Sequence, residues 1–365
     1  MRSNLSLCFI CNMNSRDRAI NCSMSSAISW MRFPLIFMIV LLHCYCAIDA
    51  HGHDNYFRWV YPFGLILGET GVPAFFFISG FLFFYSSKSY IQKIRTRVHS
   101  LLIPYVIWNG LILMVYLLMN LMGHSMMVVG KSVADYVFVD YLRAFIDRGN
   151  WDAGNGVPML CPYWYIRNLM VLCVFSPIIY YGIKYLKLIP IVALFIWWIS
   201  IPYNGMIDSS LLFFCIGAYF SIEQRNPINV LWKYRIAFVA VCLLFFLVDW
   251  SHCYWEIPYA LYVHRLSLML NIFMLLLVGS HIGNQHYLGQ ELLNHSAFWI
   301  YTVHYPMTLA LGAVSARYLQ GIADWQMFVF YWFGVLFITA LCVVIYAVLH
   351  RLCPKVLSFV TGNRS

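Results

Sequence analysis

Two ionisable side chains lie within the first long apolar segment of this sequence, which reads RFPLIFMIVLLH. Arg32 and His43 are 11 residues apart, which is three turns of an α-helix, so both lie on nearly the same face. The rise between them is roughly 16 Å at ~1.5 Å per residue. An ionisable group inside a membrane-spanning helix is a functional candidate by default. The pair therefore predicts a cation that receives an anionic ligand and a titratable base deeper in the membrane.

Each of these residues also has a structural interpretation. An Arg near a helix end can extend its charged head to the membrane interface, and a buried neutral His can bond a backbone carbonyl. His304, in the segment SAFWIYTVHYPMT, has a depth similar to that of His43. We interpret it either as a second polar group of the same cavity or as a packing residue beside Pro306.

Glu69, Arg167 and Arg265 also lie in or near apolar segments. Glu69 and Arg167 belong to the same half of the predicted bundle and would line an outward pocket or pair with each other. For each of the three residues a structural ion pair is the simpler interpretation, because an ionised side chain in a membrane needs a partner.

The most basic loop reads SSKSYIQKIRTRVHSLLIPY. Its positive charge is typical of a loop that sets the orientation of a membrane protein. Its Lys and Arg side chains also suit a phosphate-bearing cofactor, because they make charge-assisted hydrogen bonds to phosphate oxygens. The sequence contains no Walker loop, no dinucleotide fingerprint and no GxSxG elbow. ATP hydrolysis, hydride transfer and serine-hydrolase chemistry therefore have no support from motifs.

The composition indicates the class of protein in which these residues lie. Of the 365 residues, 62% are apolar or aromatic and 10% are charged, whereas a soluble protein has roughly 25% charged residues. These figures exclude disordered, collagen-like, coiled-coil and small disulfide-rich proteins. A transmembrane barrel is disfavoured, because its strands alternate over about ten residues and the apolar runs here are continuous and longer.

The sequence contains ten apolar runs, each close to the ~20 residues that a helix needs to cross the hydrocarbon. They lie near 28–48, 62–85, 101–122, 163–183, 186–203, 207–222, 233–250, 260–281, 296–317 and 325–350. The fourth to sixth runs follow one another closely. We predict an all-α polytopic membrane protein, a bundle of about ten transmembrane helices embedded in the lipid bilayer.

The basic residues predict which way this bundle faces. Loops on the side of the two termini carry twelve Lys and Arg residues, and the opposite loops carry five. By the positive-inside rule both termini are cytoplasmic. The net charge of +9 is therefore interpreted as topology and not as a nucleic-acid surface. Most acidic residues fall in the outer loops, of which the largest is 123–162.

The two ends of the chain are expected to lie outside the membrane domain. Residues 1–26 are polar and aperiodic, and we expect a disordered or mis-called N-terminal extension, with Met24 as the alternative start. Residues 351–365 are expected to form a short cytoplasmic tail.

The cysteines give little support for metal or disulfide chemistry. Cys8 and Cys11 form one CxxC pair with no second pair at zinc spacing, so no metal site is expected. Cys161 and Cys253 would form a disulfide only if they are close in space.

Five motifs follow one another in order along residues 27–350. They are Arg32 and His43 as R-x10-H, GVPAFFFISGFLFF at 71–84, the basic loop ending in LLIPY at 101–105, PYWYIRNL at 162–169 and SAFWIYTVHYP at 296–306. In this order, and with this number of apolar runs, the chain resembles the acyltransferase 3 family of bacterial integral-membrane acyltransferases. It looks most similar to the small members that O-acetylate cell-surface sugars.

The resemblance implies a fold, a reaction and a location. Residues 27–350 would form an acyltransferase 3 transmembrane domain in the bacterial inner membrane. It would move an acyl group, expected to be acetyl, from cytoplasmic acyl-CoA to a hydroxyl of a cell-surface or lipid-linked sugar. Acyl-CoA, expected to be acetyl-CoA, would be the co-substrate, and no metal is implied.

The resemblance also implies roles for single residues. His43 falls on the family's catalytic histidine, and Arg32 falls on its companion arginine. Arg97 falls on the loop that holds the coenzyme. The family often shows R-x-x-R there, whereas this chain reads RVHS, so Lys93 or Arg95 is the alternative ligand of the coenzyme phosphates.

Three further residues, Glu69, Trp164 and His304, fall within family motifs. Together with Arg167 they are expected to line the substrate cavity.

His43 could act in two ways. A neutral imidazole can take the proton of a sugar hydroxyl as that hydroxyl attacks the thioester, or it can carry the acyl group itself. The residues leave both routes open. They also leave open a transporter or flippase for an anionic or sugar substrate, although no inverted repeat of broken helices is visible, and a receptor or assembly factor.

Overall fold

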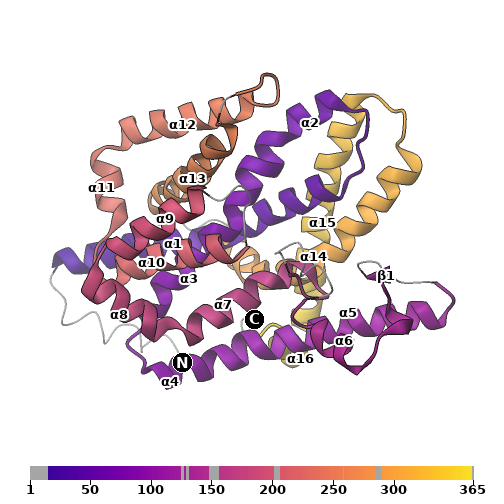
Figure 1. The fold of residues 1–365 in the computed structure, drawn as a ribbon, viewed down its shortest axis with the longest axis horizontal. Helices are drawn as coiled ribbons and strands as arrows, with labels where there is room; N and C mark the ends of the chain where they lie inside the picture. The colour runs from indigo at the N-terminus through magenta and orange to yellow at the C-terminus, as the bar shows by residue number, and fades with distance from the viewer. Residues whose placement is uncertain are drawn as a thin grey trace.

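The computed structural model describes residues 15–124, 127–128, 131–147, 156–200, 206–257, 259–283 and 289–363. Over these residues the chain is helical apart from loops and one antiparallel pair of short strands, β1 (Met127–Val128) and β2 (Lys131–Ser132) (Figure 1). The predicted all-α class is confirmed. Residues 1–14, which include Cys8 and Cys11, lie outside the described residues, and residues 15–26 of the predicted extension form the first turns of a helix.

The α-helices are numbered in chain order. They are α1 (Ser15–Ala47), α2 (Asp54–Tyr61), α3 (Gly68–Tyr85), α4 (Tyr90–Arg97), α5 (Ile103–Leu121), α6 (Phe138–Arg143), α7 (Trp164–Val174), α8 (Ser176–Leu186), α9 (Ile189–Ser200), α10 (Met206–Ile222), α11 (Pro227–Lys233), α12 (Arg235–Ser251), α13 (Ala260–Ile282), α14 (Gln290–Tyr318), α15 (Asp324–Leu352) and α16 (Pro354–Val360). Short π-helical segments, Pro62–Leu67 and Val98–Leu102, join α2 to α3 and α4 to α5.

Each of the ten predicted apolar runs overlaps helix. Five continuous segments among the described residues are long and apolar enough to cross a membrane, and two bent pairs raise the number to seven. The pair α7 and α8 is bent by 63°, and the pair α11 and α12 by 94°. The remaining three runs correspond to the shorter helices α9 and α10 and to α14.

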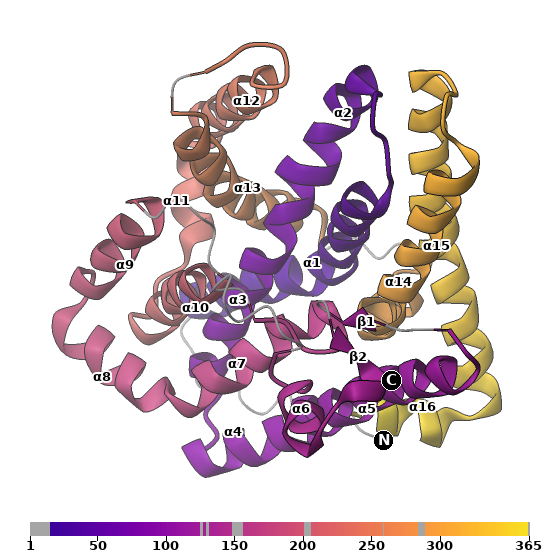
Figure 2. The same ribbon diagram turned by 45° about the vertical axis from the view of Figure 1, so that its right-hand side comes forward.

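Helix α1 lies inside the bundle and packs against α3, α13, α14 and α15 (Figures 1 and 2). Helices α3 and α10 cross so closely that glycine is required on both. A Cβ at Gly80 would lie 2.1 Å from the carbonyl oxygen of Phe214, and one at Gly217 would lie 2.0 Å from that of Phe77. Small residues let helix backbones approach in this way in membranes, which explains Gly80 in the motif ISGF.

The two ends of the bundle carry opposite charge. The start of α2, the turn between α12 and α13 and the start of α15 lie together at the top of Figure 2. This end, which we call the acidic end, carries Asp54, Asp249 and Asp324. Helices α4 and α16 lie at the bottom of the same view, and we call this end, which carries Lys93, Arg95 and the other cations of the basic loop, the basic end.

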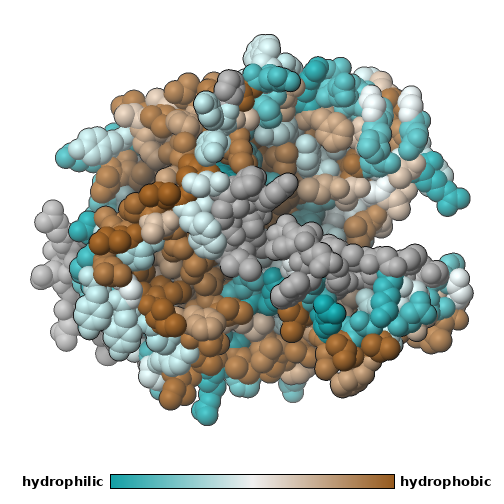
Figure 3. All heavy atoms as spheres, in the orientation of Figure 1, coloured by the Kyte–Doolittle hydropathy of each residue, from teal (hydrophilic) through white to brown (hydrophobic). Residues whose placement is uncertain are grey.

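The flank of the molecule is apolar. Figure 3 shows hydrophobic residues along the lower edge, where α5 runs, and on the left, where α8 and α9 lie, with hydrophilic residues at the upper right. Large apolar side chains on these helices stay exposed, among them Leu121, Ile178 and Ile189. A water-soluble protein rarely exposes such extended apolar patches, so these faces suit contact with lipid.

Candidate active site

Two imidazole rings meet where α1 packs on α14. The ring centroids of His43 and His304 lie 5.0 Å apart in an edge-on arrangement, and the ring of Tyr305 lies 5.3 Å from that of His43. His304 is fully buried, whereas His43 is half-buried. The structure therefore brings together two of the residues that the sequence analysis singled out.

Both imidazoles are oriented by their own helices. The Nδ1 atom of His43 lies 2.8 Å from the carbonyl oxygen of Ile39, and that of His304 lies 2.8 Å from the carbonyl oxygen of Ile300. A carbonyl oxygen can only accept, so each Nδ1 carries the proton and each neutral ring keeps its lone pair on Nε2. Within the described residues the Nε2 atom of His304 has no hydrogen-bond partner.

Arg32 is on the same helix, nearer the basic end. Helix α1 continues unbroken through Pro34, so the three-turn separation from His43 that the spacing predicted is kept. The Arg32 side chain is exposed, so its guanidinium is accessible to an anion.

The basic loop forms α4, whose start is fixed by a capping box between Ser89 and Gln92. Lys93 lies with its ammonium 5.1 Å from the ring centroid of Phe83, and Arg97 interacts with the thiol of Cys173 on α7. Arg95 is exposed. Of the three candidate coenzyme ligands, Arg95 is thus the one whose side chain extends away from the bundle.

Glu69 takes part in a hydrogen-bonded chain that the sequence analysis did not foresee. Its Oε2 lies 3.0 Å from Nε2 of His264, whose Nδ1 lies 2.9 Å from Oδ2 of Asp249. The hydroxyl of Tyr61 donates to the other oxygen of Asp249 at 3.2 Å. His264 and Asp249 stand inside apolar runs, as Arg32 does, so the same criterion of an ionisable residue within a span would have found them.

The suggested pairing of Glu69 with Arg167 is wrong. Arg167 donates from Nη1 to the carbonyl oxygens of Ile146 and Gly156, and from Nε and Nη2 to Oδ1 of Asn168 at 3.1 Å. Its guanidinium therefore ties α7 to the loop before it, and an ion pair with His264 satisfies Glu69 instead.

Two other predicted residues pack within the bundle. Trp164 begins α7, and its ring lies 6.1 Å from that of Phe76. Arg265 is fully buried and donates to the carbonyl oxygens of Trp198 and Ile199. Backbone carbonyls and the Trp198 ring, 5.6 Å away, surround this cation, which indicates a structural role.

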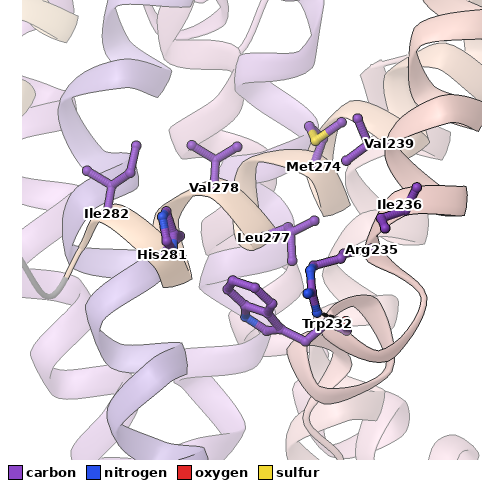
Figure 4. A pocket seen from close by; sticks show the side chains of 9 residues that line it. All are labelled: Trp232, Arg235, Ile236, Val239, Met274, Leu277, Val278, His281 and Ile282. Carbon is purple, nitrogen blue, oxygen red and sulfur yellow. Dashed lines mark hydrogen bonds between the residues drawn. The ribbon is translucent and has the colours of Figure 1, made fainter.

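A pocket of about 580 Å³ lies between α13 and the bent pair α11–α12 (Figure 4). Figure 4 shows Trp232 and Arg235 on one side and Leu277, Val278 and His281 of α13 on the other. The Trp232 indole donates to the hydroxyl of Ser280 at 3.0 Å. None of the predicted site residues lines this mostly apolar pocket, so it is separate from the imidazole pair.

The cysteines and acidic residues of the described chain show no metal centre. Within the described ranges no group of three or more His, Cys, Asp and Glu residues could hold a metal ion. Cys161 and Cys253 are free thiols, so the conditional disulfide between them is not formed.

The chain matches one protein family over most of its length. The profile of the family described as "Acyltransferase domain", Acyl_transf_3, matches residues 25–347. The chain is also 25% identical to the "Succinoglycan biosynthesis protein ExoH" of Rhizobium meliloti (strain 1021), over 95% of this chain and 94% of that protein. No solved structure matches.

Proposed function

Because the chain belongs to the acyltransferase 3 family, we propose that it moves an acyl group, expected to be acetyl, from acyl-CoA to a hydroxyl of a cell-surface or lipid-linked sugar. The succinoglycan relative supports an acceptor that is a polysaccharide or its precursor. The observation that carries the proposal is the imidazole pair, two rings 5.0 Å apart whose Nε2 lone pairs are free to act as bases or nucleophiles.

In the direct route, His43 acts as general base. The acceptor oxygen attacks the thioester carbon, Nε2 of His43 takes the hydroxyl proton, and the carbon–sulfur bond breaks. The proton then passes to the leaving thiolate, which departs as the thiol of CoA. This route makes an ester and a thiol from a hydroxyl and a thioester, and it leaves both imidazoles unchanged.

In the two-step route, His43 carries the acyl group. Its Nε2 attacks the thioester carbon, the carbon–sulfur bond breaks, CoA leaves as the thiolate, and an acyl-imidazolium that keeps its Nδ1 proton remains. The acceptor oxygen then attacks the acyl carbon, the bond from that carbon to Nε2 breaks and restores the neutral His43, and the hydroxyl proton passes through a base to the thiolate of CoA. Because Nε2 of His43 is occupied at that stage, His304 is the neighbouring base that can take the hydroxyl proton. Its buried Nε2, which has no partner among the described residues, supports this role.

The basic end suits the coenzyme. Arg32 and Arg95 are exposed and can make charge-assisted bonds to the coenzyme phosphates, with Lys93 and Arg97 as neighbouring cations. Acyl-CoA is cytoplasmic, and the excess of basic residues at this end follows the positive-inside rule. We therefore propose that both termini face the cytoplasm of a bacterial inner membrane and that the acceptor binds from the acidic end.

A transporter or flippase remains the second candidate. Chains of Asp, Glu and His within a membrane are typical of proton relays in transporters, and Glu69, His264 and Asp249 form such a chain. This candidate predicts substrate movement across proteoliposomes without consumption of acyl-CoA.

The proposal is tested by incubating purified protein with radiolabelled acetyl-CoA or succinyl-CoA and cell-envelope glycan, and then locating the label. We expect label on the glycan, and the more active donor identifies the acyl group. His43→Ala should abolish transfer while the protein still purifies as a folded species. His51→Ala is the matched control, because its side chain is 97% exposed at the acidic end. Full transfer by His43→Ala would refute the catalytic role.

A further inference from the structure

A polar pocket opens at the acidic end, beside the turn that follows α12. It has a volume of about 330 Å³ and is lined by Asp54, Phe57, Arg58, Tyr61 and Cys253. This volume is at the lower end of the ~300–1,000 Å³ found for small-molecule sites. A carboxylate, a guanidinium, a phenol and an aromatic ring form its wall, and these groups suit a ligand that presents many hydroxyls.

Arg58 is held in place within this pocket. Its Nε donates to the carbonyl oxygen of Cys253 and its Nη1 to Oδ1 of Asn55, each at 3.2 Å. Its own carbonyl oxygen accepts from the Trp250 indole at 2.8 Å, and its guanidinium lies 5.4 Å from the ring centroid of Tyr254. Such fixed polar groups lose little freedom when a ligand binds, which favours affinity.

The pocket is joined to Glu69 by the chain Tyr61–Asp249–His264–Glu69. Asp249 is buried, with 2% of its side chain exposed, whereas the Glu69 side chain is 30% exposed. Carboxylate oxygens face both ring nitrogens of His264. When both nitrogens donate, the ring is an imidazolium that holds one oxygen of Glu69 and cannot rotate. The more exposed end of the chain is thus a carboxylate of fixed orientation.

Glu69 lies on α3 at nearly the same position along the bundle axis as His43 on α1. Its neighbour Gly68 lies against α1, where a Cβ would be 2.9 Å from the Cβ of Leu42, the residue before His43. Tyr61 and Glu69 are eight residues apart and are joined by the π-helical segment Pro62–Leu67, so the pocket lies further toward the acidic end along the same continuous helix. A ligand that reaches both places must therefore be extended.

We propose that the pocket at Arg58 and Tyr61 is a subsite for a sugar residue of an oligosaccharide acceptor. Asp249 and His264 are positioning residues, and Glu69 accepts a hydrogen bond from the acceptor near His43. Because the pocket and Glu69 contact different residues of the same glycan, the acceptor is an oligosaccharide and not a monosaccharide. This inference rests on the proposed acyl transfer, which it deepens by giving the acceptor a length and a path.

The first test measures binding alone. Size-fractionated oligosaccharides from the cell-envelope glycan of the same organism are titrated into purified protein by calorimetry, without acyl-CoA. We expect longer fragments to bind more tightly, and Arg58→Gln to remove most of that preference, with roughly tenfold weaker binding of the long fragments. Tyr61→Phe keeps the ring and should weaken binding by a few-fold. Equal binding of short and long fragments, or no effect of Arg58→Gln, would overturn the subsite.

The second test measures transfer of labelled acetyl groups at varied fragment concentration. Glu69→Gln should raise the KM for every fragment by roughly tenfold to a hundredfold and leave the KM for acetyl-CoA unchanged. His264→Gln should act in the same way, and the double variant should be no worse than either single one, because the residues act as a unit. Additive losses, or a changed KM for acetyl-CoA, would contradict positioning.

Ser267→Ala is the matched control. Ser267 is buried on α13, as His264 is, and its hydroxyl donates to the carbonyl oxygen of Phe245 on α12 at 3.1 Å. It should leave both KM values and the fragment preference unchanged, which separates positioning from a general loosening of α12 and α13. If the wild-type protein binds long fragments but transfers no label, the acyltransferase proposal fails and the glycan subsite stands.

Discussion

The rings of His43 and His304 lie edge to face with their centroids 5.0 Å apart, although one residue is on α1 and the other on α14. Each Nδ1 is bonded to a carbonyl oxygen one turn earlier in its own helix. The arrangement places the two neutral imidazoles side by side inside the bundle. Variants of His304 can therefore distinguish the direct route from the two-step route.

His304→Ala should lower kcat for acyl transfer by roughly 10²–10⁴, the range for loss of a general base. If His43 carries the acyl group, the variant should still accumulate acyl-enzyme, because only the second step needs His304. Quenched-flow measurement of labelled protein and free CoA distinguishes the steps. A variant with wild-type kcat would show that His304 only packs against His43.

Arg95→Ala should raise the KM for acetyl-CoA by roughly five- to tenfold, since it removes an exposed cation that can bond phosphate. The same variant should treat acetyl-pantetheine, which lacks the nucleotide phosphates, as the wild type does. Arg235→Ala is the control, because Arg235 is also an exposed cation but lines the separate apolar pocket. An equal effect on both donors would argue against phosphate binding.

Gly80→Ala should destabilise the bundle by about 1–3 kcal/mol, the usual cost of overpacking, because the new Cβ would lie 2.1 Å from the Phe214 carbonyl oxygen. Gly182→Ala on α8 meets nothing within 4 Å and should be neutral or slightly stabilising, since Ala favours helix over Gly. Thermal unfolding in detergent measures both variants. Unfolding of the two at the same temperature would show that α3 and α10 can separate without cost.

The loop after α5 should show a pH-dependent stability that comes from Asp140. Hydrogen bonds from the Lys131 ammonium and the Val137 amide lower the pKa of Asp140 below its ordinary value. A carboxyl whose pKa is lower in the folded protein stabilises it above the unfolded pKa of ~3.9, and the effect disappears as pH falls through the folded value. Asp140→Asn should therefore speed proteolysis of this segment at pH 6, and the difference from the wild type should vanish as the pH falls through the folded pKa of Asp140.

The sequence by itself determined the class of the protein and the spacing of Arg32 and His43 along α1. Hydropathy is a property of a window of about 20 residues, so all ten helical runs were found without knowledge of any neighbour. The spacing of Arg32 and His43 along one helix face is also local, because helix geometry fixes it. These predictions need no information about which helix packs against which.

Only the tertiary structure decided which side chains contact one another. His43 meets His304, Glu69 bonds His264, and Arg167 bonds carbonyl oxygens of a loop. The bends at Phe175 and Tyr234 also escaped the sequence analysis, because a bent pair and a straight span have the same composition. Which side chains meet depends on how closely helix backbones approach, and close approach is set by residues such as Gly68 and Gly80, whose effect appears only when a second helix lies against them.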